Sequence, residues 1–140
     1  MSKRINERFL SCYMELDKNC CDKFGVATGG TTEYINRLNN ARFAPGREDA
    51  LPRLVKYRNI RNKIAHELGS IRKINDISKV DIAWLKKFNK DIVRRKDPIS
   101  LYLKRARRYA RRRRIKRYIT AGAIVLSLIL GIILYFVLSK

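Results

Sequence analysis

The sequence has 140 residues, with 33 Lys or Arg against 12 Asp or Glu, and its formal net charge is +21. A chain of this length holds one domain of roughly 100 residues with little left over, which excludes a multidomain enzyme. Because 46% of the residues are hydrophobic, a disordered polyelectrolyte is also excluded. The positive charge predicts an anionic partner: a membrane surface, a nucleic acid or both.

Three helices are predicted in the first half of the chain. The first covers about residues 5–24, where apolar side chains recur at helical spacing, and the run GVATGGTT ends it. The second covers about residues 32–42 and is broken by Pro45-Gly46. The third begins near Asp49, tolerates a proline in its first turn, and runs to about Leu68, with a glycine as its C-cap.

Two more helices are predicted in the second half. Ser78 and Asp81 resemble a capping box, so a fourth helix starts there and continues until Asp97-Pro98 interrupts it. Neither Gly nor Pro occurs between Ile99 and Ala121, which predicts a fifth helix that runs without a break into the apolar segment described below. No pair of strands is indicated. The predicted fold class is all-α: a four- to five-helix bundle in residues 1–103, followed by a single C-terminal transmembrane helix.

Residues 104–117, with the sequence KRARRYARRRRIKR, carry about half of the excess charge. They hold ten basic side chains and no acidic one, whereas residues 1–103 hold 22 basic and 12 acidic side chains. The first hundred residues are therefore only moderately basic. The segment 104–117 is interpreted first as a juxtamembrane topology signal. Attraction of RNA is the alternative interpretation.

Residues 118–138, with the sequence YITAGAIVLSLILGIILYFVL, contain no charge and no Pro. A helix of this length is roughly 31 Å long, the thickness of a bilayer core, so a transmembrane helix is predicted. Its position predicts a tail-anchored protein, and the basic segment before it places the N-terminal domain in the cytoplasm. Anionic lipid is a predicted partner, because four consecutive arginines would lie near the headgroups, each contributing on the order of 1 kcal/mol. These are Arg111, Arg112, Arg113 and Arg114.

The cysteines indicate neither disulfides nor a metal site. Their number, three, is odd, and the predicted side of the membrane is the reducing one. Cys12 and Cys20 fall on the apolar stripe of the first helix and are interpreted as small core residues. Three cysteines on one helix and one distant histidine do not match zinc-site spacing, so no metal and no cofactor is predicted.

The third predicted helix contains YRNIRNKIAHE, residues 57–67, which is the segment that carries chemistry. On a helical wheel its apolar residues share one arc. The opposite arc holds Arg58, Asn59, Asn62, Lys63 and His66. Arg61 falls within the apolar arc, where it must reach solvent, pair with a carboxylate or meet a partner chain. His66 is the only histidine, and imidazole is the side chain best suited to move protons near neutral pH.

The run Arg61-Asn62-Lys63-Ile64-Ala65-His66 resembles the Arg-polar-x-x-x-His motif of the HEPN superfamily (higher eukaryotes and prokaryotes nucleotide-binding domains). The resemblance covers about residues 5–105 and implies a compact helical bundle. It also implies a metal-independent endoribonuclease, in which His66 acts as general acid or base. Arg61 would stabilise charge on the phosphate and Asn62 would orient groups in the site. The RNA's own 2′-hydroxyl would attack, leaving a cyclic phosphate and a free 5′-hydroxyl.

A homodimer across the third helix is predicted from the spacing of the motif. Arg61 and His66 are about 140° apart around a helix and roughly 7.5 Å apart along it, so one copy cannot easily aim both at one phosphate. The resemblance implies a composite cleft built by two copies. Lys56, Arg58 and Lys63 are candidates to hold the RNA backbone, and a merely solvated face is the alternative for these three.

Three functions remain in competition. The first is a membrane-anchored ribonuclease of HEPN type acting on RNA, a prokaryotic toxin or defence effector at the inner membrane, whose antitoxin or regulator the sequence does not identify. The second is a non-catalytic HEPN-like module that binds RNA, nucleotide or protein. The third is a polybasic, tail-anchored membrane adaptor in which Arg61 and His66 have no role.

Overall fold

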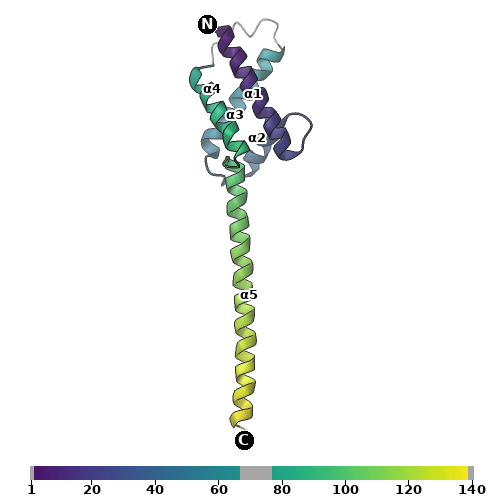
Figure 1. Cartoon of the computed structure of the whole chain (residues 1–140), viewed down its shortest axis with the longest axis vertical. Helices are drawn as coiled ribbons and strands as arrows, with labels where there is room; N and C mark the ends of the chain where they lie inside the picture. Colours follow the sequence, from purple (N-terminus) through teal and green to yellow (C-terminus); the bar gives the residue numbers. More distant parts are fainter. Residues whose placement is uncertain (1, 67–76, 139–140) are drawn as a thin grey trace. The chain divides into compact units, whose positions relative to one another are not determined.

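The structure is a computed structural model that describes residues 2–66 and 77–138 (Figure 1). Within these, nothing is described for the side chains of residues 2, 3, 66, 133, 134, 136 and 137. The described residues form helices and contain no strand, which confirms the all-α prediction. The helices are α1 (Ser2–Phe24), α2 (Gly30–Asn40), α3 (Arg47–His66), α4 (Lys79–Val93) and α5 (Pro98–Leu138).

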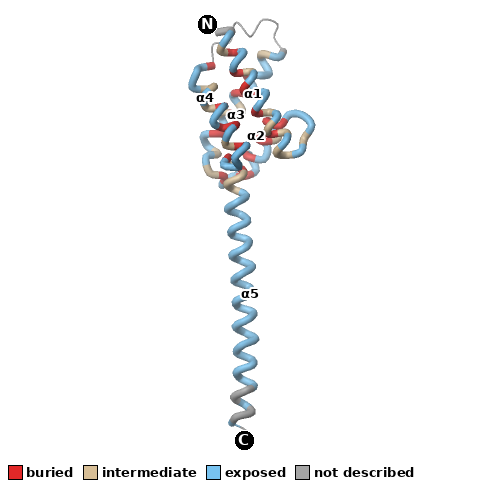
Figure 2. The backbone as a smooth tube through the Cα atoms, viewed as in Figure 1, coloured by how far each residue is buried: buried red, intermediate tan, exposed pale blue. Residues whose placement is uncertain are grey.

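The chain divides into two units, Met1–Tyr102 and Leu103–Lys140. The first unit holds α1 to α4 and the first turn of α5. In it α1 packs against α2, α3 and α4, and α2 also packs against α3. Figure 2 shows the buried positions gathered on the facing sides of these helices. The largest fully buried side chains are aromatic or leucine, and they include Phe9, Leu16, Tyr34, Leu38, Leu54, Tyr57 and Leu85.

The start of α2 is fixed by a close approach to α1. A Cβ atom on Gly30 would collide with the Asp17 carbonyl oxygen and the Cys21 amide nitrogen, so only glycine fits there. The Asp17 carboxylate also accepts a hydrogen bond from the Thr31 amide at 2.7 Å, which satisfies a donor that the first turn of α2 leaves open. The helix therefore begins two residues earlier than the predicted residue 32.

The other helix ends agree with the predictions in part. Ser78 and Asp81 form the predicted capping box, and α5 is the predicted unbroken helix. The prediction that α4 continues to Asp97-Pro98 is wrong, because α4 ends at Val93 and Arg95 adopts a left-handed φ of 55°. The predicted C-terminal end and glycine cap of α3, at residues 68 and 69, lie outside the described residues.

Asp97 is fully buried at the N-terminus of α5 and joins three helices of the first unit. Lys23 of α1 contacts its carboxylate at 2.6 Å, and the Tyr34 hydroxyl of α2 donates to it at 2.8 Å. The Ser100 amide donates to the same carboxylate at 3.2 Å. Burial alone would raise the pKa of Asp97, but the hydrogen bonds from Lys23 and Ser100 and the Lys23 charge hold it below its ordinary value.

The second unit consists of the rest of α5. Every side chain described between Leu103 and Leu138 is exposed within this chain. The hydroxyls of Thr120 and Ser127 donate at 2.8 Å to carbonyls of their own helix, so neither is left unpaired. By length and composition the apolar part of α5 can cross a membrane, and the described residues contain one such helix.

Candidate functional site

Arg61 and Asn62 are exposed on the last turns of α3. An N–H group of the Arg61 guanidinium donates to Asn62 Oδ1 at 3.3 Å. Among the ion pairs of the described residues, none involves Arg61. His66 is the final residue of α3, one turn after Asn62, and its side chain lies outside the description.

Within this single chain Arg61 is exposed. The buried residues of α3 are Ala50, Leu54, Tyr57 and Ile60. Beyond Ile60 the only partly buried apolar side chain described on this helix is Ile64, which packs against the core. Among the described residues, Arg61 is therefore exposed beside a turn that still packs against the core.

Arg58 and Arg61 share the side of α3 that faces α1. The Tyr13 side chain of α1 is 4% exposed, and its burial raises the pKa of its hydroxyl above the ordinary value. The positive charges of Arg61 and Arg58 partly offset that rise. Arg58 is half-buried and Arg61 is exposed, so this pair forms a cationic edge beside α1.

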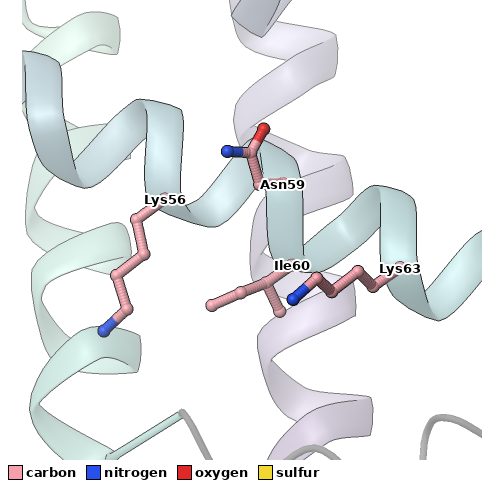
Figure 3. A pocket seen from close by; sticks show the side chains of 4 residues that line it. All are labelled: Lys56, Asn59, Ile60 and Lys63. Atoms are coloured by element: carbon pink, nitrogen blue, oxygen red, sulfur yellow. The ribbon is translucent and has the colours of Figure 1, made fainter.

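Lys56 and Lys63 lie on another side of the same helix. Together with Asn59 and Ile60 they line a shallow hollow of about 360 Å³ (Figure 3). In Figure 3 the two ammonium groups lie on the side of α3 where Ile60 projects, and Asn59 extends to the other side of the ribbon. Lys56 is also 3.7 Å from the Asp81 carboxylate of α4. Asn59 was not among the predicted site residues, although its spacing from Lys56 and Lys63 could have indicated it.

The middle of α3 is held in place by α4. The Tyr57 hydroxyl donates to Asp81 Oδ1 at 2.8 Å, and the same carboxylate accepts from the Ser78 amide at the start of α4. Burial and the neighbouring Asp81 raise the pKa of Tyr57. Burial alone would raise the pKa of Asp81, but its hydrogen bonds from Ser78 and Tyr57 and the Lys56 charge lower it. Two hydrogen bonds to Asp81 therefore connect the middle of α3 to the start of α4, next to the turn that carries Lys56 and Arg58.

The cysteines belong to the core of the first unit. Cys12 and Cys20 are buried and unpaired, as predicted, and Cys21 is half-buried. Burial raises the pKa of the Cys20 thiol to about 12, so this thiol stays protonated and unreactive at neutral pH. Among the described residues no three His, Cys, Asp or Glu side chains are grouped to hold a metal ion.

Five of the six predicted residues of α3 thus divide between two sides of the helix, and the side chain of the sixth, His66, lies outside the description. The charges of Arg58 and Arg61 act on Tyr13 of α1, and Asn62 accepts a hydrogen bond from Arg61. Lys56 and Lys63 line the hollow. Guanidinium and amide groups in solvent are able to contact a phosphate oxygen and to donate hydrogen bonds to it. The site as described offers anion binding from one copy of the chain.

Comparison with known proteins gives one result. No curated protein and no solved structure matches the chain significantly. Residues 7–137 match a family of unknown function, DUF6548. The matched region includes nearly all of the first unit, the basic segment and almost the whole apolar part of α5. The chain belongs to the DUF6548 family.

Proposed function

We propose that the chain is a membrane-anchored, metal-independent endoribonuclease with an HEPN-like bundle, acting as a homodimer. The observation that carries this proposal is the state of Arg61. Among the described residues it is exposed, donates a hydrogen bond only to Asn62 and forms no ion pair. A charged residue that serves the fold looks different: Asp97 is fully buried and has three hydrogen-bonding partners. Arg61 is left to meet a ligand.

In the proposed mechanism, His66 removes the proton from the RNA 2′-hydroxyl, whose oxygen then attacks the adjacent phosphorus. The bond to the 5′-oxygen breaks, and that oxygen leaves with a proton supplied by a general acid. Arg61 donates hydrogen bonds to the phosphate as negative charge builds up, and Asn62 orients the guanidinium through the contact at 3.3 Å. The products are a 2′,3′-cyclic phosphate and a 5′-hydroxyl.

The location follows from the second unit. We place the apolar part of α5 across the membrane and the N-terminal domain in the cytoplasm, because the ten cations of residues 104–117 precede the span. Tethering raises the local concentration of copies and favours the dimer. A ribonuclease held at the inner membrane of a prokaryote suits a toxin or defence effector.

Single substitutions test the proposal. The full chain in neutral detergent is incubated with mixed RNA in EDTA, and the new ends are mapped. We expect ends with cyclic phosphates, and at least about a hundredfold slower cleavage for Arg61→Ala and for His66→Ala. Arg42→Ala is the matched control, because Arg42 is equally exposed but lies before the start of α3. Unchanged cleavage by both variants, or cleavage that stops in EDTA, contradicts the proposal.

A second candidate is an RNA-binding module without cleavage. It is favoured by the hollow between Lys56 and Lys63, which offers two cations to a phosphate backbone. In the same experiment this candidate gives retention of intact RNA that weakens steeply as salt increases. Growth inhibition on expression, relieved by His66→Ala, distinguishes the first candidate from it.

A further inference from the structure

The basic segment of α5, residues 104–117, has no continuous apolar side, because Arg113 and Arg117 interrupt the side that Ala106, Tyr109 and Ala110 share. Successive residues turn by about 100° along one unbroken helix, so the ten cations taken together are distributed around the whole axis. All of its side chains are exposed within the second unit. A helix that lies flat in a membrane interface needs a continuous apolar face. The basic segment therefore does not lie on the membrane but continues the axis of the apolar segment away from it.

Distance divides the segment into two parts. With a rise of about 1.5 Å per residue, Arg114 lies roughly 6 Å before Tyr118, Arg108 roughly 15 Å and Lys104 roughly 21 Å. The headgroup layer is about 5–7 Å deep on each side of a bilayer, and the Debye length in physiological salt is about 8 Å. The part from Arg111 to Arg117 is within reach of the headgroups. The part from Lys104 to Tyr109, which we call the distal segment, lies beyond or at the limit of that reach.

The distal segment combines charge with an aromatic ring. Some of its cations are four residues apart and so lie on the same side of the helix, as Arg108 does with Lys104 and with Arg112. Such like-charged pairs destabilise a helix. No acidic side chain follows Asp97 in the sequence to offset this repulsion, and an external polyanion would offset it. Tyr109 is 72% exposed, between Arg105 and Arg113 one turn away on each side. Cations with an interleaved aromatic ring are the pattern that binds single-stranded nucleic acid, whose bases stack on the ring.

We propose that the distal segment binds single-stranded RNA, while Arg111 to Arg117 contact anionic lipid. The role of this binding rests on the proposed function: the distal segment would hold the RNA substrate close to the nuclease domain. The binding itself does not require cleavage. Its components are Lys104, Arg105, Arg107, Arg108 and Tyr109.

The test measures binding without cleavage. The full chain carrying His66→Ala is placed in nanodiscs of phosphatidylcholine with phosphatidylglycerol, and a fluorescein-labelled 20-nucleotide oligouridine is titrated at several KCl concentrations. Two matched sets of substitutions each remove four charges. The distal set changes Lys104, Arg105, Arg107 and Arg108 to Gln, and the proximal set changes Arg111, Arg112, Arg113 and Arg114 to Gln. Tyr109→Ala and Tyr109→Phe form the second matched pair.

We expect the distal set to weaken binding at least tenfold and to reduce the slope of log affinity against log salt by about 3. The proximal set keeps the affinity within about threefold, because lipid already occupies those charges. Tyr109→Ala weakens binding at least about fivefold and Tyr109→Phe leaves it unchanged, since phenylalanine also stacks.

Three results would overturn the inference: equal losses for the two charge sets, equal affinities for Tyr109→Ala and Tyr109→Phe, or a distal set that loses binding to phosphatidylglycerol vesicles instead of RNA. The last result would assign the distal segment to the membrane. If RNA binding depends on the distal segment, and the unmodified chain with His66 intact does not cleave RNA, this inference is upheld and the proposed nuclease is contradicted.

Discussion

Replacing Asp97 with Asn is expected to lower the free energy of unfolding of the first unit by about 3–5 kcal/mol, because it leaves the Lys23 charge without its partner in a partly buried place. The Lys23 side chain is 17% exposed and the Asp97 side chain is not exposed at all. The change also weakens the hydrogen bond from the Tyr34 hydroxyl, which lies in the core. Denaturant unfolding of the full chain in neutral detergent, followed by the fluorescence of Trp84, measures this loss. Trp84 is the only tryptophan and belongs to α4.

Asp22→Asn is the matched control, because Asp22 is exposed on the same helix as Lys23, and we expect a change below about 0.5 kcal/mol. The pH dependence gives a second readout. The pKa of Asp97 is lower in the folded state than its ordinary value of about 3.9, so its stabilisation is complete above that pH and is lost as the pH falls below it. Asp97→Asn should make this acid dependence shallower. A stability equal to that of Asp22→Asn at pH 7 would contradict the buried ion pair.

Gly30→Ala is expected to have a comparable effect for a steric reason. The added Cβ atom meets backbone atoms of Asp17 and Cys21 in α1, and backbone cannot rotate away as a side chain can. Overpacking of a core costs about 1–3 kcal/mol and more where backbone must move, so we expect about 3 kcal/mol at least. Thermal unfolding monitored by far-ultraviolet circular dichroism and by Trp84 fluorescence measures it.

The control for Gly30→Ala is Thr32→Ala, two residues later on the exposed side of α2. Alanine has a higher helix propensity than threonine, so this variant is expected to keep or slightly raise the midpoint. A Gly30→Ala variant as stable as Thr32→Ala would mean that α1 and α2 do not approach as closely as the structure shows.

The sequence allowed the helices to be predicted because their signals are local. The period of the apolar residues, the Ser78–Asp81 capping box and the uninterrupted run after Pro98 all act within a few residues. The ends that were mispredicted depend on distant partners. The start of α2 depends on its close approach to the backbone of α1. The end of α4 is followed by Asp97, which is buried against Lys23, a residue 74 positions away in the sequence. No local pattern contains that information.

The candidate site was predictable as a segment but not as a surface. The helical wheel placed Arg58 and Lys63 together on the arc opposite the core. In the structure Arg58 lies near Tyr13, whereas Lys63 lines the hollow on another side of α3. The wheel also placed Arg61 among apolar neighbours, but its side chain is exposed although Ile64, three residues later, packs against the core. Periodicity gives the angle of a residue around a helix; how far the neighbouring helices cover it depends on tertiary packing.

Mixing two inactive variants measures most directly whether two copies of the chain build one RNA-cleaving site. Arg61→Ala and His66→Ala chains are combined in equal amounts, exchanged in detergent, and assayed with RNA in EDTA. A composite cleft that takes Arg61 from one copy and His66 from the other leaves one intact cleft in each mixed dimer. Because half of the dimers are mixed, the expected activity is about one quarter of that of the unmodified chain. A mixture as inactive as either variant alone, with both variants folded by Trp84 fluorescence and dimeric, would contradict the shared site.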